Sequence, residues 1–139
     1  MYDHIISNVF LGSAAALRTK HKFHTIVNCT HEIAFPKYCQ NCIRLPIDDD
    51  PENSSALLTL IHETNVLEHI HNCPGDVLVH CYAGIQRSCA VVACYLIRYH
   101  NMTPDDAIKY IQTKREVAFM DEVRFLSAIR KIEIYSPNI

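Results

Sequence analysis

Apolar residues recur at two different spacings along the chain, and the two spacings predict different elements. Short apolar runs bounded by turn residues are typical of buried strands. Four segments have this pattern: residues 10–12, 25–29, 43–47 and 77–79. Ser13 is placed to cap a short helix that extends to Thr19. Residues 31–42, around Pro36, are predicted as a loop, and an edge strand within this loop is the alternative.

Longer segments repeat their apolar residues every three or four positions, which is the spacing of an amphipathic helix. One such helix is predicted over residues 54–71, and residues 88–100 are apolar nearly all round, as in a helix at the centre of a domain. Thr103 and Pro104 form a strong helix start, and a last helix is predicted over residues 121–132. Strands interleaved with helices indicate an α/β fold with a small central, mostly parallel β-sheet flanked by helices.

Length, charge and hydropathy set limits on the class of protein. With 139 residues, 49% of them apolar, the chain is expected to form one domain over residues 1–139. The net charge of −2, with acids and bases interspersed, gives no broad basic face for a nucleic acid or a membrane. The longest apolar run, residues 89–97, is shorter than the roughly 20 residues of a membrane-spanning helix, and no signal peptide is found. We therefore expect a soluble protein located in the cytoplasm, with the nucleus as the alternative location.

Seven cysteines are an odd number in a chain without an export signal, so they are predicted to be free thiols rather than a disulfide framework. Cys39 and Cys42 have the spacing of metal ligands, but no second pair of this kind follows, so no metal is expected. Cys89 and Cys94 are predicted to be core residues of the central helix. Several histidines are predicted to be exposed helix positions rather than ligands: His62, His69 and His71.

The stretch from residue 80 to residue 88 places a cysteine, a glycine and an arginine between a predicted strand and a predicted helix. A buried strand that turns a corner would explain it, and so would a cradle for an oxyanion. In the second interpretation, backbone N–H groups and the positive end of the helix dipole point at one centre. Gly84 allows the torsion angles of such a curl, and Arg87 offers a planar fork for two phosphate oxygens. The backbone groups of the cradle belong to Tyr82, Ala83, Gly84, Ile85, Gln86 and Arg87.

Cys81 stands at the centre of this predicted cradle. The positive field favours ionisation of its sulfur, which as a thiolate at neutral pH can attack phosphorus. Ser88 is placed to hydrogen-bond the sulfur and to ease its departure in a second step. His80 is expected to brace the loop through its ring nitrogens.

The pattern H-C-x-x-G-x-x-R-S at residues 80–88 resembles the signature of the cysteine-dependent protein tyrosine phosphatases, and its surroundings are similar to their dual-specificity branch. The similarity covers nearly the whole chain, including Ile6–Ser13 and Val91–Leu96. It implies the phosphatase-like fold, a phosphate-binding P-loop and a phosphoric monoester hydrolase without a cofactor. The implied substrate is a phosphorylated protein, cleaved at phosphotyrosine and phosphoserine or phosphothreonine through a phosphocysteine intermediate.

Phosphoryl transfer also needs an acid to protonate the leaving oxygen. The resemblance places this acid on a loop that precedes the nucleophile, and the matching loop is Asp48–Asp50. Alignment of residues 45–47 with the family pattern selects Asp49 as the general acid, and Asp50 is the second candidate. At least one of the three carboxylates is expected to belong to an ordinary solvated turn.

Two features depart from the family pattern. Relatives often carry an Asn shortly before an aromatic residue of the last loop, where it supports the phosphate cradle, whereas Asp121 and Glu122 precede Phe125 here. The chain has no Trp, so the Trp-Pro-Asp loop of the classical tyrosine-specific enzymes is missing, which implies a shallow pocket. Cys29 is expected to be an ordinary core residue, although the resemblance leaves open a disulfide between Cys29 and Cys81 on oxidation.

The same chemistry has alternative substrates, namely an RNA 5′-triphosphate or a phosphoinositide. Gln86 and Cys89 stand where RNA-directed relatives commonly have Asn and Gly, and the basic loop of lipid phosphatases is missing from residues 82–86. Both observations argue against RNA and phosphoinositide substrates. A non-catalytic phosphate-binding module would lack Cys81, Arg87 or the acid, and all are present. The sequence does not indicate an oligomeric state.

Overall fold

A five-stranded β-sheet forms the framework of the protein in a computed structural model, which describes residues 1–134. The strands lie in the order β1-β2-β5-β3-β4. β1 runs antiparallel to β2, and the other neighbouring pairs are parallel. The strands are β1 (Tyr2–Ile6), β2 (Val9–Gly12), β3 (Thr25–Asn28), β4 (Asn41–Arg44) and β5 (Val77–His80). The predicted mostly parallel sheet is therefore confirmed.

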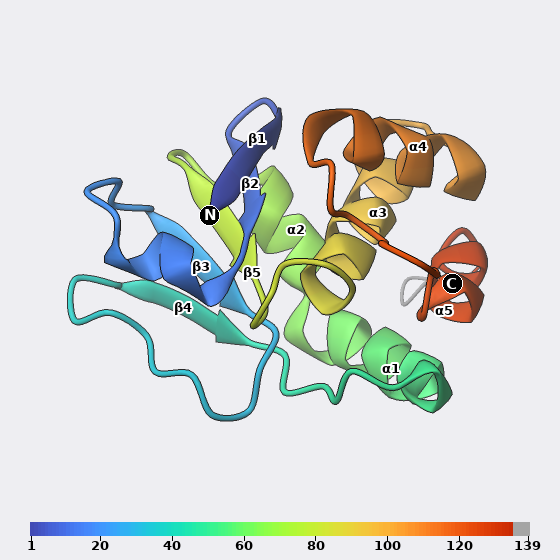
Figure 1. The fold of residues 1–139 in the computed structure, drawn as a ribbon, viewed down its shortest axis with the longest axis horizontal. Helices are drawn as coiled ribbons and strands as arrows, with labels where there is room; N and C mark the ends of the chain where they lie inside the picture. Colours follow the sequence, from blue (N-terminus) through green and yellow to red (C-terminus); the bar gives the residue numbers. More distant parts are fainter. Residues whose placement is uncertain (135–139) are drawn as a thin grey trace.

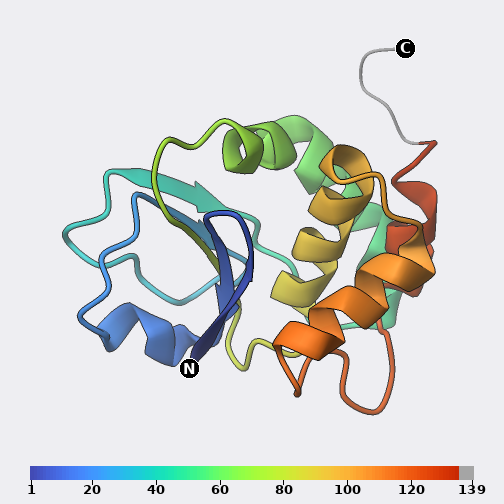
Figure 2. The ribbon, with the colours of Figure 1, turned by 90° about the horizontal axis from the view of Figure 1, so that it is seen from above.

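The α-helices lie on one side of this sheet and a 3-10 helix lies on the other (Figure 1, Figure 2). The helices are α1 (Ser54–Thr64), α2 (Val66–His71), α3 (Arg87–Tyr99), α4 (Pro104–Lys114) and α5 (Leu126–Lys131), with 3-10 segments η1 (Ala14–Arg18) and η2 (Pro51–Asn53). The larger hydrophobic core surrounds α3, whose residues 88–97 are all buried. The smaller core, around Phe23, Ile26 and Leu78, fills the side of η1. Within residues 1–134, none of the helices has the length and hydropathy to cross a bilayer.

Three predicted helices differ in the structure. The helix predicted over residues 54–71 is interrupted at Asn65, whose left-handed backbone, with a φ of 57°, separates α1 from α2. Asn tolerates this conformation better than most residues. The last helix begins at Leu126 because the preceding segment bonds to the loop before α3. The segment after Ser13 is a 3-10 helix, and the Ser13 hydroxyl donates to the Met1 carbonyl instead of capping it.

Two predictions around the edge of the sheet are corrected. β4 occupies residues 41–44 rather than 43–47 and lies at the edge of the sheet, and residues 31–40 form a loop without a strand. Pro46 lies beyond the strand, as expected of a residue without an N–H for the ladder. Cys39 and Cys42 form a disulfide, so the prediction that all cysteines are free is wrong. Their Cα atoms lie 6.3 Å apart at the start of β4, within bridging range, and an odd cysteine count does not exclude one local bridge.

The register of the parallel strands brings their carboxyl ends to one edge of the sheet. Asn28 pairs with His80 of β5 and with Arg44 of β4. Just beyond the ladder, the Cys29 N–H donates to the His80 carbonyl over 2.8 Å. In α/β sheets, ligands bind beyond the carboxyl ends of the strands. The loop that joins β5 to α3 therefore lies where a site is expected (Figure 1).

Candidate active site

The cysteine loop, residues 81–86, joins β5 to α3 and bends around the sulfur of Cys81. The Gly84 N–H donates to this sulfur over 3.2 Å, and the Ser88 hydroxyl oxygen lies 3.2 Å from it. Cys81 is only 3% exposed. The structure thus brings the nucleophile candidate together with an amide donor and with the hydroxyl that the sequence placed beside it.

Gly84 is the residue at which the cysteine loop reverses direction. Its φ of 71° belongs to the left-handed region, which glycine enters without strain. A Cβ at this position would lie 2.6 Å from the Gly12 carbonyl and 2.6 Å from the Arg115 guanidinium. Both the backbone torsion and the close approach of neighbouring chain therefore require glycine here.

Arg115 holds the cysteine loop from outside and was not identified from the sequence. This buried residue ends α4 and donates to the Gly84 carbonyl over 2.8 Å and to the Ala83 carbonyl over 3.2 Å. Its third contact is an ion pair of 2.8 Å with Asp3 of β1. A basic residue at a helix carboxyl end is common for reasons of the helix dipole alone. The sequence therefore gives no signal for this bracing role.

Arg87 and His80 flank the cysteine loop at its two ends. An Arg87 Nη1–H donates to the Ile47 carbonyl over 3.1 Å, while its buried Nε–H has no hydrogen-bond partner within residues 1–134. Because a buried unpaired donor is costly, this N–H is available to an acceptor such as an oxyanion. Burial lowers the pKa of His80. The hydrogen bond to the Cys81 backbone raises this pKa, whereas the positive charges of Arg44 and Arg87 lower it further. The neutral ring donates from Nδ1 to the Cys81 carbonyl over 3.0 Å and so braces the loop.

Gln86 joins the cysteine loop to the segment before α5. Its side-chain amide donates to the Glu122 carbonyl over 2.6 Å, and its side-chain oxygen accepts from the Arg124 N–H over 3.1 Å. The Phe119 N–H adds a bond to the Ile85 carbonyl over 2.8 Å. The family's supporting Asn is missing from this segment, and a buried glutamine makes the connection from the opposite side. Its side chain was not assigned this role from the sequence.

The three carboxylates of the acidic turn, Asp48–Asp50, have different partners. Asp48 pairs with His31 at 3.0 Å, Asp49 pairs with Arg124 at 2.9 Å, and Asp50 accepts from the Glu52 N–H at 3.0 Å. Asp50 is therefore engaged as the cap of η2. Asp49 is linked through Arg124 to the segment that Gln86 holds. The backbone of the turn also approaches α3, since the carbonyl before Asp48 is the one that Arg87 contacts.

Burial keeps the other cysteines of the core protonated. The pKa of Cys29 is raised by burial and further by the neighbouring Cys81. Burial also raises the pKa of Cys89, and it raises the pKa of Cys94 to about 12. The prediction that Cys89 and Cys94 are core residues is confirmed, because both are fully buried. Cys29 is likewise a core residue.

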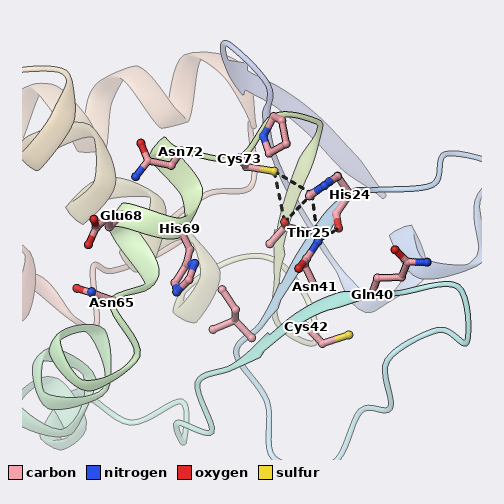
Figure 3. Close-up of a pocket in the computed structure, with 12 residues that line it drawn as sticks. His24, Thr25, Gln40, Asn41, Cys42, Asn65, Glu68, His69, Asn72 and Cys73 are labelled. Atoms are coloured by element: carbon pink, nitrogen blue, oxygen red, sulfur yellow. Dashed lines mark hydrogen bonds between the residues drawn. The ribbon is translucent and has the colours of Figure 1, made fainter.

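A cavity of about 680 Å³ lies at the opposite end of the sheet (Figure 3). Its wall includes the amino ends of β3 and β4 and part of α2. There the His24 ring nitrogen lies 3.3 Å from the Cys73 sulfur and 3.1 Å from the Thr25 hydroxyl. Within residues 1–134, no three His, Cys, Asp or Glu side chains are arranged to hold a metal ion. None of the predicted catalytic residues lines this cavity, so the candidate site is the cysteine loop.

Comparison with known proteins identifies the family. Residues 9–134 match the model of the dual specificity phosphatase catalytic domain. The chain belongs to the dual specificity phosphatase family. Human dual specificity protein phosphatase 14 is 31% identical over 124 residues, which cover 81% of this chain and 60% of that protein. The crystal structure of human DUSP28, at 26% identity, matches with a TM-score of 0.80 over 96% of this chain and 93% of that chain.

A mouse dual specificity phosphatase complexed with zinc tungstate also matches, with a TM-score of 0.82 and 26% identity over 96% of this chain and 86% of that one. These dual specificity phosphatase structures confirm the predicted phosphatase-like α/β fold. The chain spans about 60% of the length of the first curated relatives that it matches.

Proposed function

We propose that the chain is a dual-specificity protein phosphatase, which hydrolyses phosphotyrosine and phosphoserine or phosphothreonine in protein substrates. Its membership in the dual specificity phosphatase family supports this class of hydrolase. The observation that carries the proposal is the environment of the Cys81 sulfur, which has an amide donor and a hydroxyl each at 3.2 Å. The unpaired buried Nε–H of Arg87 supplies a charged donor for the substrate's phosphate.

In the first step, the Cys81 thiolate attacks phosphorus as the bond between phosphorus and the ester oxygen breaks. The amides of the cysteine loop and the Arg87 guanidinium stabilise the charge on the remaining phosphate oxygens. Asp49 donates a proton to the leaving oxygen, which a serine or threonine alcohol needs most because its alkoxide is a poor leaving group. The product is a phosphocysteine and the dephosphorylated side chain.

In the second step, water attacks the phosphocysteine and the bond between sulfur and phosphorus breaks. The Asp49 carboxylate now accepts the proton from this water, and phosphate is released. The Ser88 hydroxyl donates a hydrogen bond to the departing sulfur. A mouse relative complexed with zinc tungstate, whose tetrahedral oxyanion resembles phosphate, is consistent with this use of the fold.

The RNA and phosphoinositide alternatives have less support. The curated relatives are named as protein phosphatases. The cysteine loop also lacks lysine and arginine between Cys81 and Arg87, which leaves few cations for a polyanionic headgroup or a triphosphate. A single catalytic domain over residues 1–139 and a cytoplasmic or nuclear location belong to the same proposal.

The test is a comparison of initial rates with the Cys81→Ser variant. Phosphotyrosyl and phosphothreonyl peptides should be hydrolysed by the unaltered protein in the presence of a metal chelator, and vanadate should inhibit the reaction. Cys81→Ser should abolish turnover, whereas Cys73→Ser, which removes a free thiol far from the cysteine loop, should leave it unchanged. Faster hydrolysis of triphosphate-ended RNA or of a soluble phosphoinositide than of either peptide would contradict the substrate class. Retained turnover in Cys81→Ser would contradict the mechanism.

A further inference from the structure

A groove opens directly beside the cysteine loop, on the η1 side of the sheet. Its volume is about 370 Å³, and its wall is mainly apolar, with Leu17, Ile33 and Phe35 among its residues. Tyr82, which is 68% exposed, also lines it. Because Tyr82 belongs to the cysteine loop, the groove borders that loop. We call this cavity the side groove.

The walls of the side groove are fixed by hydrogen bonds. Arg44 donates to the carbonyls of Thr30 and His31 over 2.9 and 3.2 Å and to that of Ile33 over 2.8 Å. Its guanidinium also lies over the Phe35 ring, 4.9 Å from the ring centre. On the other wall, the N–H of Ala14 donates to the Tyr82 carbonyl over 2.9 Å. The side groove is therefore formed before any partner arrives, which lowers the entropic cost of binding.

Charge distinguishes the two flanks of the cysteine loop. On one flank lie the acidic turn and Glu122, whose carboxylates pair with His31 and Arg124. On the other, the exposed Arg18 lines the side groove, and within residues 1–134 no carboxylate lies within ion-pair distance of it. An acidic residue of a peptide in the side groove is therefore attracted by Arg18.

We infer that the side groove binds a bulky apolar side chain of the phosphoprotein substrate, next to an acidic residue that faces Arg18. This inference rests on the proposed function and adds a sequence preference to it. The apolar wall matches an aliphatic side chain, and Tyr82 belongs both to this wall and to the cysteine loop. Consecutive Cα atoms lie about 3.8 Å apart and an extended peptide advances about 3.3 Å per residue. The three residues on either side of the phosphorylated one, about 10 Å of extended chain each way, are therefore the positions to test.

The experiment uses a set of phosphotyrosyl peptides with alanine at the three positions before and the three positions after the phosphotyrosine. In each peptide of the set, a single leucine replaces one of these alanines. One position should raise kcat/KM roughly tenfold, about half of what full burial of leucine provides. Ala34→Phe, which fills the side groove from an exposed wall position, should reduce that preference to less than about twofold. Glu32→Phe, in the same loop but outside the lining, is the control and should keep the preference. All three proteins should hydrolyse para-nitrophenyl phosphate at similar rates.

A second arm places aspartate beside the favoured leucine. It should raise kcat/KM roughly two- to fivefold at low salt, and Arg18→Gln should remove this gain. Equal kcat/KM for every peptide, with normal hydrolysis of para-nitrophenyl phosphate, would overturn the side-groove inference and leave the proposed function intact. Absence of turnover on every phosphate ester would overturn both. A side groove occupied by a second copy would show as dimers that Ala34→Phe dissociates, without any peptide preference, and would also overturn the inference.

Discussion

Removal of the Arg115 side chain tests whether the cysteine loop is held from outside through its carbonyl groups. The Arg115 side chain is 7% exposed, and its guanidinium bonds to the Gly84 carbonyl, the Ala83 carbonyl and the Asp3 carboxylate. Two of these contacts fix the shape of the loop, and the third fixes the arginine itself. Arg115→Ala removes all three, Arg115→Lys removes the fork but keeps the charge, and Asp3→Asn removes only the ion pair.

The structure predicts the order in which the three substitutions lower the free energy of unfolding. Loss of a hydrogen bond from a charged donor costs about 1.5–3 kcal/mol. The Gly84 carbonyl lies in a buried residue and would keep only the weak hydrogen bond from the Cys89 thiol, 3.4 Å away, whereas exposed Ala83 can bond to water instead. The Asp3 side chain is 42% exposed, so screening limits its ion pair to about 1 kcal/mol. We therefore expect losses in the free energy of unfolding of about 3–4 kcal/mol for Arg115→Ala, about 1–2 for Arg115→Lys and about 1 or less for Asp3→Asn.

Urea unfolding at pH 7 measures these losses, with Glu116→Ala as an exposed neighbour that should change the free energy by less than about 0.5 kcal/mol. The rate on para-nitrophenyl phosphate, measured below the unfolding transition, should fall in the same order, because a loosened loop no longer aims its amides at the phosphate. A loss below about 1 kcal/mol for Arg115→Ala would refute the bracing role. An equal loss for Asp3→Asn would refute the assignment of the main energy to the carbonyl contacts.

Three further predictions concern other parts of the chain. Asp49→Ala should slow hydrolysis of phosphothreonyl peptides roughly 100-fold or more while sparing aryl phosphates, and Asp50→Ala should slow it only a few-fold; the reverse order would reassign the acid. Asn65→Ala should lower the free energy of unfolding by about 1 kcal/mol and Asn65→Gly should not, because only the alanine is strained at a φ of 57°. Burial lowers the pKa of His80 in the folded state, so below about pH 6.5 the unfolded state binds a proton at His80 that the folded state does not bind. The free energy of unfolding should therefore decrease as the pH falls below about 6.5. Urea unfolding at pH 7.5 and 5.5 should show a smaller decrease for His80→Asn.

The parts of the fold that were predicted correctly are those that local sequence determines. A buried strand such as Val77–His80 is a run of apolar residues, and the α3 segment is apolar all round because every side of that helix is covered. The cysteine loop was found because its nucleophile, its glycine and its arginine lie within one short stretch of chain. The break between α1 and α2 at Asn65 was not predicted, because apolar residues recur on both sides of it. One left-handed residue changes the direction of the helix without an obvious change in that pattern.

The supports of the site escaped prediction for a different reason, since they come from remote segments. Arg115 contacts the cysteine loop across 31 residues and Gln86 contacts the segment before α5 across 36 residues. Neither residue type, at the end of a helix or in a loop, indicates its partner. The family pattern pointed to a missing Asn, yet the connection exists because the glutamine inside the loop reaches out to the same segment. In this chain the connection is therefore made by a side chain of the cysteine loop rather than by one of the segment before α5.

The same reasoning bears on the choice among the three aspartates. All three follow one strand and precede one proline, and only alignment with the family pattern selected Asp49 among them. Their contacts differ: Asp50 accepts a hydrogen bond at the start of η2, and Asp48 pairs with His31. Asp49 pairs with Arg124, whose backbone N–H is held by Gln86 of the cysteine loop itself. Of the three, Asp49 is the one tied to the loop that surrounds the sulfur, which is why we assign the proton transfer to it.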